Sequence, residues 1–236
     1  MSSEVLTEQF TEQGREIQLW CEGLKEIYLA RIFSEISPEH IAVFCADMIN
    51  GFCKEGALAS ERVGAIARPI SFLFVNLKYF GVNKFVLVQE WHDPHAKEFE
   101  SFPKHGVMET AEAETIERLA ILAFADKFIV FKKNSLSPAF SGLKEWLCGQ
   151  DIRLAVVVGN CTDLCVRELA MFIRLWANEY QKDMRVIIPA NCVQTFDLPF
   201  GIAQKIGAKP HPGDVYHMWA LYEMSRNGID VVKKVL

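Results

Sequence analysis

Short runs of apolar residues alternate along this chain with longer segments in which apolar residues recur at helical spacing. Six runs predict strands, the last of them more weakly: Ile41–Ala46, Lys84–Val88, Phe128–Phe131, Leu154–Val158, Arg185–Ile188 and Asp230–Val235. Four segments predict helices: Leu58–Phe80, Glu114–Ala123, Asp163–Gln181 and Val215–Arg226. Continuous apolar strands between helices are typical of a parallel sheet that is covered on both faces. The pattern therefore predicts a three-layer, Rossmann-like α/β domain with a mostly parallel sheet of six strands.

The chain shows no internal repeat, low-complexity tract or linker-like stretch that would divide it. At 236 residues it is long enough to bury a sizeable core as one domain. Residues 1–40 precede the first predicted strand and have helical character. We expect them to form an N-terminal helical extension packed on a domain of residues 41–236.

The charge balance limits the kind of partner that this chain can have. Its net charge is −5, from 25 Lys and Arg against 30 Asp and Glu, and basic residues do not cluster. This argues against nucleic acid or an anionic membrane as the main partner. The polar, acidic N-terminus resembles neither a signal peptide nor a transit peptide. We expect a cytoplasmic protein that acts on a small molecule, with the nucleus as an alternative location. A homo-oligomer is an alternative to a monomer.

The cysteines indicate free thiols rather than a disulfide framework. There are seven, an odd number, and they are widely spread in a chain without an export signal. No Cys-x-x-Cys pair occurs, so a structural zinc knuckle has no support.

The candidate chemistry lies where the predicted strands end, because parallel α/β sheets bind ligands beyond the carboxyl ends of their strands. Asp47 follows the first strand, "EWHDPHAKEFESFPKHG" includes the end of the second, Lys132 and Lys133 follow the third, and "GNCTDLC" follows the fourth. Loops at one edge of the sheet can converge on one crevice.

Cys165 is the candidate nucleophile. Gly159 ends the fourth strand, and Thr162 or Asp163 can cap the helix that follows, which places Cys165 in its first turn. Free backbone N–H groups there favour a thiolate and can hold an oxyanion. Cys161 lies on the preceding turn, where it would contribute its backbone N–H. Buried cysteines are common, so the pattern alone leaves a packed, inert Cys165 equally open.

A metal site is the second candidate. Glu90 and His92 are two residues apart on an extended segment, so their side chains share a face, and His105 follows in the sequence. A solvated acidic loop with surface histidines remains the alternative at this point.

Four motifs in order resemble those of the isochorismatase-like cysteine hydrolases, and among them the nicotinamidases: "ADMINGF", "EWH…FPKH", "KNS…AF" and "GNCTDLCV". The resemblance extends over nearly all of the chain from Ile41 onward. Two later segments, "NCVQTFDLP" and "HPGDVYHMWALYEMSRNG", are similar to the plant-type nicotinamidases.

The resemblance implies a catalytic triad of Asp47, Lys133 and Cys165. The "KNS" match favours Lys133, although it stands seven residues before Phe140 and the family lysine usually stands six before a phenylalanine; Lys132 is the alternative. The resemblance also implies a cis peptide bond between Asn160 and Cys161, with the N–H groups of Cys161 and Cys165 forming the oxyanion hole.

The resemblance also implies one divalent transition metal per chain, with zinc expected and manganese or iron as alternatives. Its ligands would be Glu90, His92 and His105, with Glu98 as the candidate fourth ligand and His95 or Glu100 as alternatives. This sequence departs from the family pattern twice, with Glu90 in place of the usual Asp and Gly106 in place of a frequent Cys.

The pocket implied by the resemblance contains Phe52 and Phe102 on either side of a pyridine ring, with Trp91 as a further wall. The function predicted is a metal-assisted cysteine amidohydrolase that converts nicotinamide to nicotinate and ammonia through a thioester, in NAD salvage. The alternatives are another amidase or ureidase with the same triad, or a non-catalytic metal- or partner-binding module. Because the triad and the metal ligands lie on different loops, we expect labelling of Cys165 to survive removal of the metal.

Overall fold

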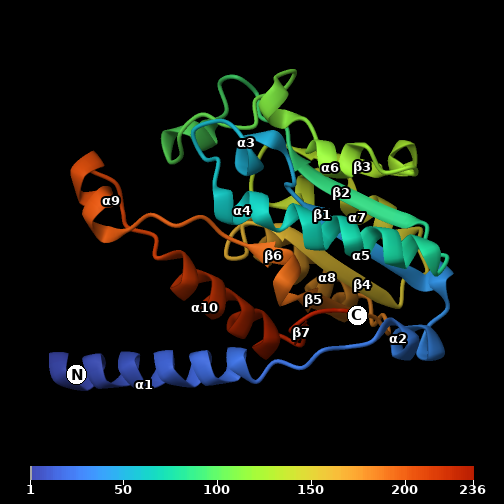
Figure 1. Cartoon of the computed structure of the whole chain (residues 1–236), viewed down its shortest axis with the longest axis horizontal. Coiled ribbons are helices and arrows are strands. Elements are labelled where there is room, and N and C mark those ends of the chain that lie inside the picture. The colour runs from blue at the N-terminus through green and yellow to red at the C-terminus, as the bar shows by residue number, and fades with distance from the viewer. Residues whose placement is uncertain (1) are drawn as a thin grey trace.

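Seven strands form one sheet at the centre of the computed structural model, which describes residues 2–236 (Figure 1). The order is β3-β2-β1-β4-β5-β7, and β6 pairs with the end of β4. Every pairing is parallel. The strands are β1 Ile41–Ala46, β2 Lys84–Glu90, β3 Ile129–Lys133, β4 Leu154–Asn160, β5 Arg185–Pro189, β6 Val193–Gln194 and β7 Asp230–Val232. The predicted parallel α/β sheet is confirmed. The seventh strand, β6, was not predicted because two residues are too few to show a periodicity.

Helices cover both faces of this sheet. They are α1 Ser3–Glu22, α2 Leu29–Glu35, α3 Asn50–Cys53, α4 Glu61–Ala65, α5 Ala67–Tyr79, α6 Glu117–Ala120, α7 Leu143–Cys148, α8 Cys165–Glu179, α9 Phe200–Ile206 and α10 Gly213–Arg226. Short 3₁₀ turns lie between them, at Pro38–His40, Lys97–Glu100, Ala111–Ala113, Ala125–Lys127, Pro138–Phe140 and Ala190–Cys192.

Two helix predictions were too long. The segment Leu58–Phe80 forms two helices, α4 and α5, which meet at Ile66. Pro69 lies in the first turn of α5 and has no N–H to donate to the preceding turn, so a continuous helix would lack a hydrogen bond there. In the segment Glu114–Ala123, only α6 is helical, because Thr115 forms a bridge to Ile49 and the Ile116 N–H donates to the carbonyl of Met48.

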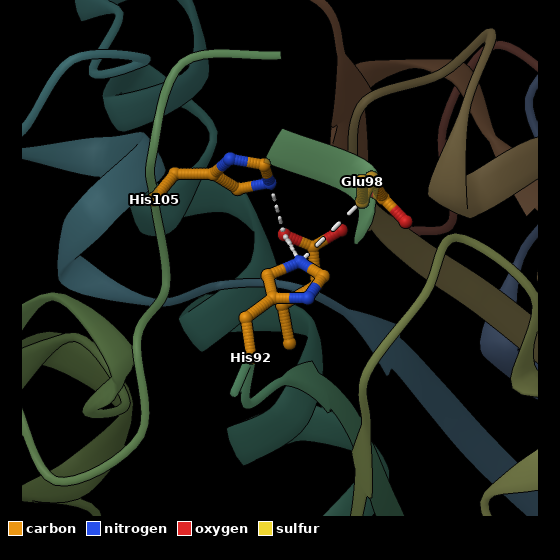
Figure 2. Close-up of side chains that lie close together, drawn as sticks. His92, Glu98 and His105 are labelled. Atoms are coloured by element: carbon orange, nitrogen blue, oxygen red, sulfur yellow. Dashed lines mark ion pairs between the residues drawn. The ribbon is translucent and has the colours of Figure 1, made fainter. Parts of the chain in front are cut away.

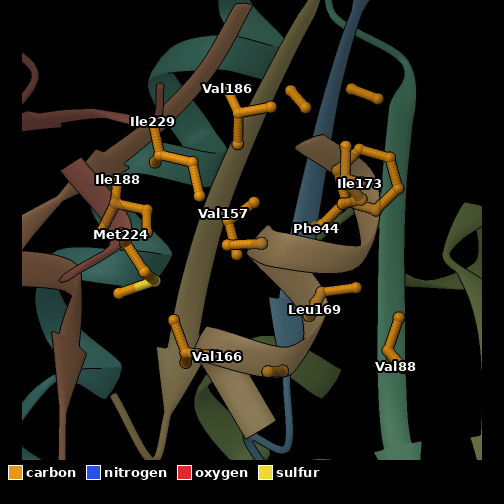
Figure 3. Packing of buried hydrophobic residues seen from close by; sticks show 14 of the residues in the cluster. Phe44, Val88, Val157, Val166, Leu169, Ile173, Val186, Ile188, Met224 and Ile229 are labelled. Carbon is orange, nitrogen blue, oxygen red and sulfur yellow. The ribbon is translucent and has the colours of Figure 1, made fainter. Parts of the chain in front are cut away.

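The alternation of side chains along the strands divides the core between two layers. Ala42, Phe44 and Ala46 of β1 belong to one apolar cluster, with α7, α8 and α10, whereas Val43 and Cys45 belong to the other, with α2 and α5. Figure 3 shows the first cluster, in which Phe44 and Val157 of the sheet meet Ile173 of α8. Burying each such side chain stabilises the fold by about 1.5–3 kcal/mol.

The N-terminal residues pack along the opposite side of α10 from the sheet (Figure 1). Ile17 of α1 is buried, and Trp20 meets Tyr222 of α10 edge-on with ring centroids 5.4 Å apart. The chain then reaches the far end of the sheet, where Ile27 forms a parallel bridge with Val235. Met1 lies outside the described residues. Across residues 2–236, no helix has the length and apolar character needed to cross a membrane.

The strand order brings four carboxyl ends together. β3, β2, β1 and β4 are consecutive neighbours, so the segments that leave them lie at one edge of the sheet. Between β1 and β4 the strand order reverses direction, and such a switch point is where ligands bind in parallel sheets.

Candidate active site

Asp47, Lys133 and Cys165 meet at this edge of the sheet. Asp47 follows β1, Lys133 is the last residue of β3, and Cys165 is the first residue of α8. Lys133 Nζ lies 2.9 Å from Asp47 Oδ2 and 3.6 Å from Cys165 Sγ. All three side chains are buried. The structure thus brings together the three residues that the sequence predicts as the triad.

Backbone geometry places the cysteine. Gly159 has a φ of +116°, and a Cβ there would come within 2.1 Å of the Ala46 carbonyl oxygen, so only glycine allows β4 to pass β1 here. The peptide bond between Asn160 and Cys161 is cis, as the resemblance implies. Because Cys165 begins α8, its N–H has no carbonyl partner one turn back and is available to a ligand.

The predicted helix cap is wrong. The helix begins at Cys165 with Leu164 at the N-cap, and no side chain of the described chain caps it. Thr162 and Asp163 make other contacts instead: Thr162 Oγ1 lies 2.9 Å from His217 Nδ1, and Asp163 Oδ2 lies 2.8 Å from His211 Nε2.

A second carboxylate, that of Glu90, touches the triad. It ends β2, and its Oε1 accepts hydrogen bonds from Lys133 Nζ at 3.1 Å and from Cys165 Sγ at 3.4 Å. Asp47 also contacts Glu90, through a 2.6 Å bond that its Oδ1 accepts from the Glu90 backbone N–H. Glu90 is therefore part of the nucleophile's surroundings, which the motif assignments did not anticipate.

The two carboxylates have pKa values that are pushed apart. Burial raises the pKa of Asp47 to about 6, against the opposing charge of Lys133. Burial acts on Glu90 in the same sense, but the charge of Lys133 and the contacts with His105 and His92 outweigh it and hold the pKa of Glu90 well below its ordinary value. Asp47 is therefore the carboxylate that can exchange a proton near neutral pH, while Glu90 stays ionised.

Burial raises the pKa of the Cys165 thiol well above its ordinary value, although the charge of Lys133 acts in the opposite direction. Burial acts against the charge of Lys133, but the charges of Asp47 and Glu90 outweigh it and raise the pKa of Lys133, so this side chain stays protonated. In the resting site the proton therefore stays on sulfur, next to a carboxylate that can accept it.

Four potential metal ligands converge beside the triad. One ligand atom from each of Glu90, His92, Glu98 and His105 lies within 4.8 Å of the others. Figure 2 shows the labelled His92, Glu98 and His105 pointing toward one another from three segments. Glu90 Oε2, His92 Nε2 and Glu98 Oε1 are buried without a hydrogen-bond partner among the described atoms. Buried polar atoms normally have partners, so this arrangement fits a cation held by nitrogen and oxygen ligands.

Hydrogen bonds at the far side of each ring orient the histidines. His105 Nδ1 lies 2.6 Å from the carbonyl oxygen of Pro103, which can only accept, so Nδ1 carries the proton. His92 Nδ1 lies 3.1 Å from Asn134 Oδ1, which also accepts from the Asp93 N–H. Both rings therefore present Nε2 to the cluster, which is the usual arrangement around a metal-binding histidine.

The two departures from the family pattern lie next to each other in the structure. Gly106 lies directly against Glu90, and a Cβ on Gly106 would meet the Cβ of Glu90 at 3.3 Å. Gly106 also has a φ of +51°, which L side chains rarely adopt. The missing side chain leaves room for the longer arm of Glu90, whose two oxygens then face different neighbours: Oε1 the triad and Oε2 the two histidines.

A small cavity opens above Cys165. It is lined by Phe52, Leu58, Glu90, Glu98, Phe102, His105, Leu136, Cys161, Leu164, Cys165 and Phe196. Phe52 and Phe102, predicted as pocket residues, are both among the residues that line it. The sequence analysis missed Leu58, Leu136, Leu164 and Phe196, since isolated apolar residues in loops carry no distinguishing signal.

Trp91, predicted as a wall of the pocket, is not among the described residues that line this cavity. Its ring lies under Lys132, whose Nζ is 3.1 Å from the ring centroid. Neighbouring residues of a strand point to opposite faces, which turns Trp91 and Lys132 away from Glu90 and Lys133. Of the alternative ligands, His95 is exposed and Glu100 pairs with Lys97, so Glu98 is the acidic side chain that completes the cluster.

A buried cysteine, lysine and aspartate thus meet at the strand ends of a parallel sheet. The chain belongs to the isochorismatase domain family, whose model matches residues 41–232, and the predicted resemblance is confirmed. Among curated relatives, Nicotinamidase 1 of Arabidopsis thaliana is 26% identical over 212 residues, which are 83% of this chain and 86% of that protein.

Solved structures have the same fold. A nicotinamidase of Bacillus subtilis is 26% identical, with a TM-score of 0.63, and the match covers 82% of this chain and 99% of that one. A pyrazinamidase of Pyrococcus horikoshii, solved in complex with zinc, is 21% identical, with a TM-score of 0.63 and the same coverage.

Proposed function

We propose that this protein is a metal-assisted cysteine amidohydrolase that converts nicotinamide to nicotinate and ammonia through a thioester. One observation carries the proposal: Cys165 and three of the four potential metal ligands line the same small, aromatic cavity. A flat ring with a nitrogen on one side and a carboxamide on the other can face the potential metal ligands and Cys165 at once. The similarity to nicotinamidases from two organisms supports this choice of substrate.

In the proposed reaction, Asp47 takes the Cys165 proton as the sulfur attacks the carboxamide carbon and the C–S bond forms. The oxyanion is held by the backbone N–H groups of Cys161 and Cys165. Asp47 then returns the proton to the nitrogen as the C–N bond breaks and ammonia leaves. Water next attacks the thioester, Asp47 accepts a proton from it, and the sulfur leaves with a proton as nicotinate is released.

Lys133 supports this sequence electrostatically. It lies within 3.6 Å of Cys165 Sγ and contacts both carboxylates, so its charge favours the thiolate as the proton moves to Asp47. The pKa of about 6 for Asp47 keeps this carboxylate ionised at neutral pH and still basic enough to accept a proton.

Glu90, His92, Glu98 and His105 would hold one divalent ion, and their mixed imidazole and carboxylate ligands suit zinc, with manganese or iron as alternatives. When bound, such an ion supplies a Lewis acid beside the cavity that can hold a pyridine nitrogen. The zinc complex of the pyrazinamidase with the same fold supports this assignment. We place the reaction in NAD salvage in the cytoplasm, where seven free thiols would persist.

Ammonia release from a panel of amides tests this function directly. We expect the purified protein to hydrolyse nicotinamide faster than aliphatic amides, benzamide or ureido compounds. Benzamide is the matched control, because it keeps the ring and the carboxamide but lacks the ring nitrogen. A protein that prefers ureido or aliphatic amides would be a different amidase of the same family, and one that hydrolyses none would be a binding module.

We expect metal removal to raise the KM for nicotinamide strongly and the KM for benzamide little, because only nicotinamide loses a contact to its ring nitrogen. Elemental analysis should find about one transition-metal ion per chain in the isolated protein.

Metal retention should weaken as the pH falls through the histidine range, since imidazole binds metal only when neutral. Burial opposes protonation of His105, but contact with Glu90 outweighs it and raises the pKa of His105, so protons compete with the metal for this ligand at a higher pH than at an ordinary histidine. A protein that takes up no metal and hydrolyses nicotinamide normally would exclude the metal site alone.

The sequence predicts that Cys165 can still be labelled after metal removal, and the contacts of Glu90 with Cys165 and with His92 add a dependence of the labelling rate on the metal. The negative charge of Glu90 raises the pKa of the Cys165 thiol. A cation bound to Glu90 offsets that charge, so iodoacetamide should label Cys165 more slowly after metal removal.

Substitution of Glu90 separates its two roles. Glu90→Asp should still bind metal, because the shorter carboxylate is the usual family ligand, but it should retract from Lys133 and Cys165. Glu90→Gln should bind metal poorly, since it lacks the charge. Metal content and Cys165 labelling, measured on both variants, distinguish these outcomes; equal metal content in the two would show that Glu90 is not a ligand.

A further inference from the structure

Phe196 lies on the cavity wall beside the nucleophile loop. It follows β6, which pairs with the end of β4 through Gly159 and Val193 and through Asn160 and Gln194. The Gln194 carbonyl also accepts a hydrogen bond from the Thr162 N–H at 3.1 Å. The segment that carries Phe196 is therefore attached to the same turn that presents Cys161 and Cys165, and all three residues line the cavity.

The ring of Phe196 is the first of three stacked rings, and the other two support it. His211 lies between Phe196 and Tyr216, with centroid distances of 3.9 and 4.1 Å and interplanar angles of 14° and 8°. Parallel rings at this spacing fix one another's orientation. An antiparallel bridge between Leu198 and His211 closes the loop that contains α9. The rings of Phe196 and His211 therefore come from the two ends of this loop.

Both nitrogens of His211 have partners that hold its ring in this plane. Nδ1 lies 3.1 Å from the carbonyl oxygen of Phe196, and Nε2 lies 2.8 Å from Asp163 Oδ2. Each ring nitrogen of His211 thus has an oxygen within hydrogen-bond distance, on a ring that lies between two aromatic faces. His211 thus has no freedom to rotate without losing a hydrogen bond or a stacking partner.

The same histidine reaches the nucleophile loop. Asp163 lies two residues before Cys165 in sequence, and burial of this carboxylate is offset by its bond to His211, which lowers its pKa. The stack therefore joins three parts of the site: the cavity wall at Phe196, the nucleophile loop at Asp163, and α10 at Tyr216. None of the triad or metal contacts uses these residues.

We propose that Phe196 is a substrate-contacting wall that selects flat aromatic amides, and that His211 is the positioning residue that holds it. The inference rests on the proposed amidohydrolase function and adds the residues that choose the ring. Phe52 and Phe102 then bound the cavity together with Phe196, and the three rings favour a planar ligand over an aliphatic one.

The test compares KM and kcat of variants for nicotinamide and for an aliphatic amide. Phe196→Ala should raise the KM for nicotinamide roughly tenfold, as expected for the loss of one aromatic contact, and should change kcat by less than about threefold. The aliphatic amide should show little change, so the preference for the aromatic ring falls. Phe196→Leu keeps apolar volume but lacks a flat face, so its KM for nicotinamide should lie between those of the wild type and Phe196→Ala. It is also the control for a folding defect in Phe196→Ala.

Two variants of His211 separate its stacking from its bond to Asp163. His211→Ala should raise the KM about as much as Phe196→Ala does, and the KM of the double variant should be no higher than that of Phe196→Ala alone, because both act on the KM through one ring. His211→Phe keeps a flat ring between Phe196 and Tyr216 but cannot bond to Asp163; it should restore the KM while lowering kcat. Phe200→Ala, on an exposed phenylalanine of α9, is the matched control and should change neither.

Protection of Cys165 from iodoacetamide by nicotinamide measures binding without turnover. Phe196→Ala and His211→Ala should need about tenfold more nicotinamide for half-protection, in line with their KM. If the wild type hydrolyses nicotinamide and Phe196→Ala leaves KM and protection unchanged, the inference is overturned and the function stands. If no aromatic amide is hydrolysed or protects Cys165, both the function and the inference are overturned.

Discussion

We expect Cys165→Ala to abolish amide hydrolysis and to leave the fold intact. The substitution removes the sulfur that attacks the carbonyl but keeps the backbone N–H at the start of α8. Cys165 also belongs to the apolar cluster beneath α8, where alanine is tolerated with a small cavity. Ammonia release measures the loss, and thermal unfolding together with metal content shows that the site is otherwise assembled.

Cys161→Ala is the matched control, because both cysteines are buried and line the same cavity. The Cys161 Sγ lies 3.6 Å from Asn160 Oδ1, and the proposed contribution of this residue is its backbone N–H. We therefore expect this variant to keep substantial activity. An inactive Cys161→Ala beside an active Cys165→Ala would show that the nucleophile has been assigned to the wrong cysteine.

Lys133→Ala should lower kcat/KM by several orders of magnitude, as does removal of other members of a concerted catalytic set. The substitution takes away the only cation among two buried carboxylates and a thiol, so proton transfer from Cys165 to Asp47 loses its electrostatic support. Leaving buried charges unpaired also destabilises a protein, by about 3–5 kcal/mol. Thermal unfolding must accompany the kinetics, and Lys133→Met, which keeps the apolar stem, separates loss of charge from loss of packing.

Lys132→Ala is the control for the neighbouring lysine. Its ammonium group lies over the ring of Trp91 on the opposite face of β3, outside the triad. We expect less than a tenfold change in kcat/KM. If Lys132→Ala were inactive and Lys133→Ala active, the catalytic assignment would move to Lys132, and the placement of β3 would be wrong by one residue.

Much of this arrangement could be predicted because it depends on local patterns. The strands β1, β2, β4 and β5 are continuous apolar runs, and strands of this kind are recognisable from composition alone. Once the strands are known, the residues that follow them are known, and a parallel sheet brings neighbouring strand ends to one edge. Asp47, Lys133 and Cys165 were identified in this way, together with the motifs that match the family.

Other features depended on contacts between distant segments, and the sequence did not show them. The break between α4 and α5 follows from Pro69, but the loss of helix before α6 follows from a pairing of Thr115 with Ile49 that no local pattern indicates. The missing cap of α8 has the same origin. Thr162 and Asp163 are good capping residues, yet their side chains bond to His217 and His211, about 50 residues later in the chain.

By itself, the sequence determined which residue types stand at each strand end, and so which chemistry the site can perform. Only the tertiary structure decided how those residues are arranged in the site. The spacing of Glu90 and His92 places them on one face, but whether a glutamate reaches one site or two depends on the space around it. Gly106, Lys133 and Cys165 set that space, and they come from three other segments, so the bridging carboxylate exists only once the sheet and its loops have packed together.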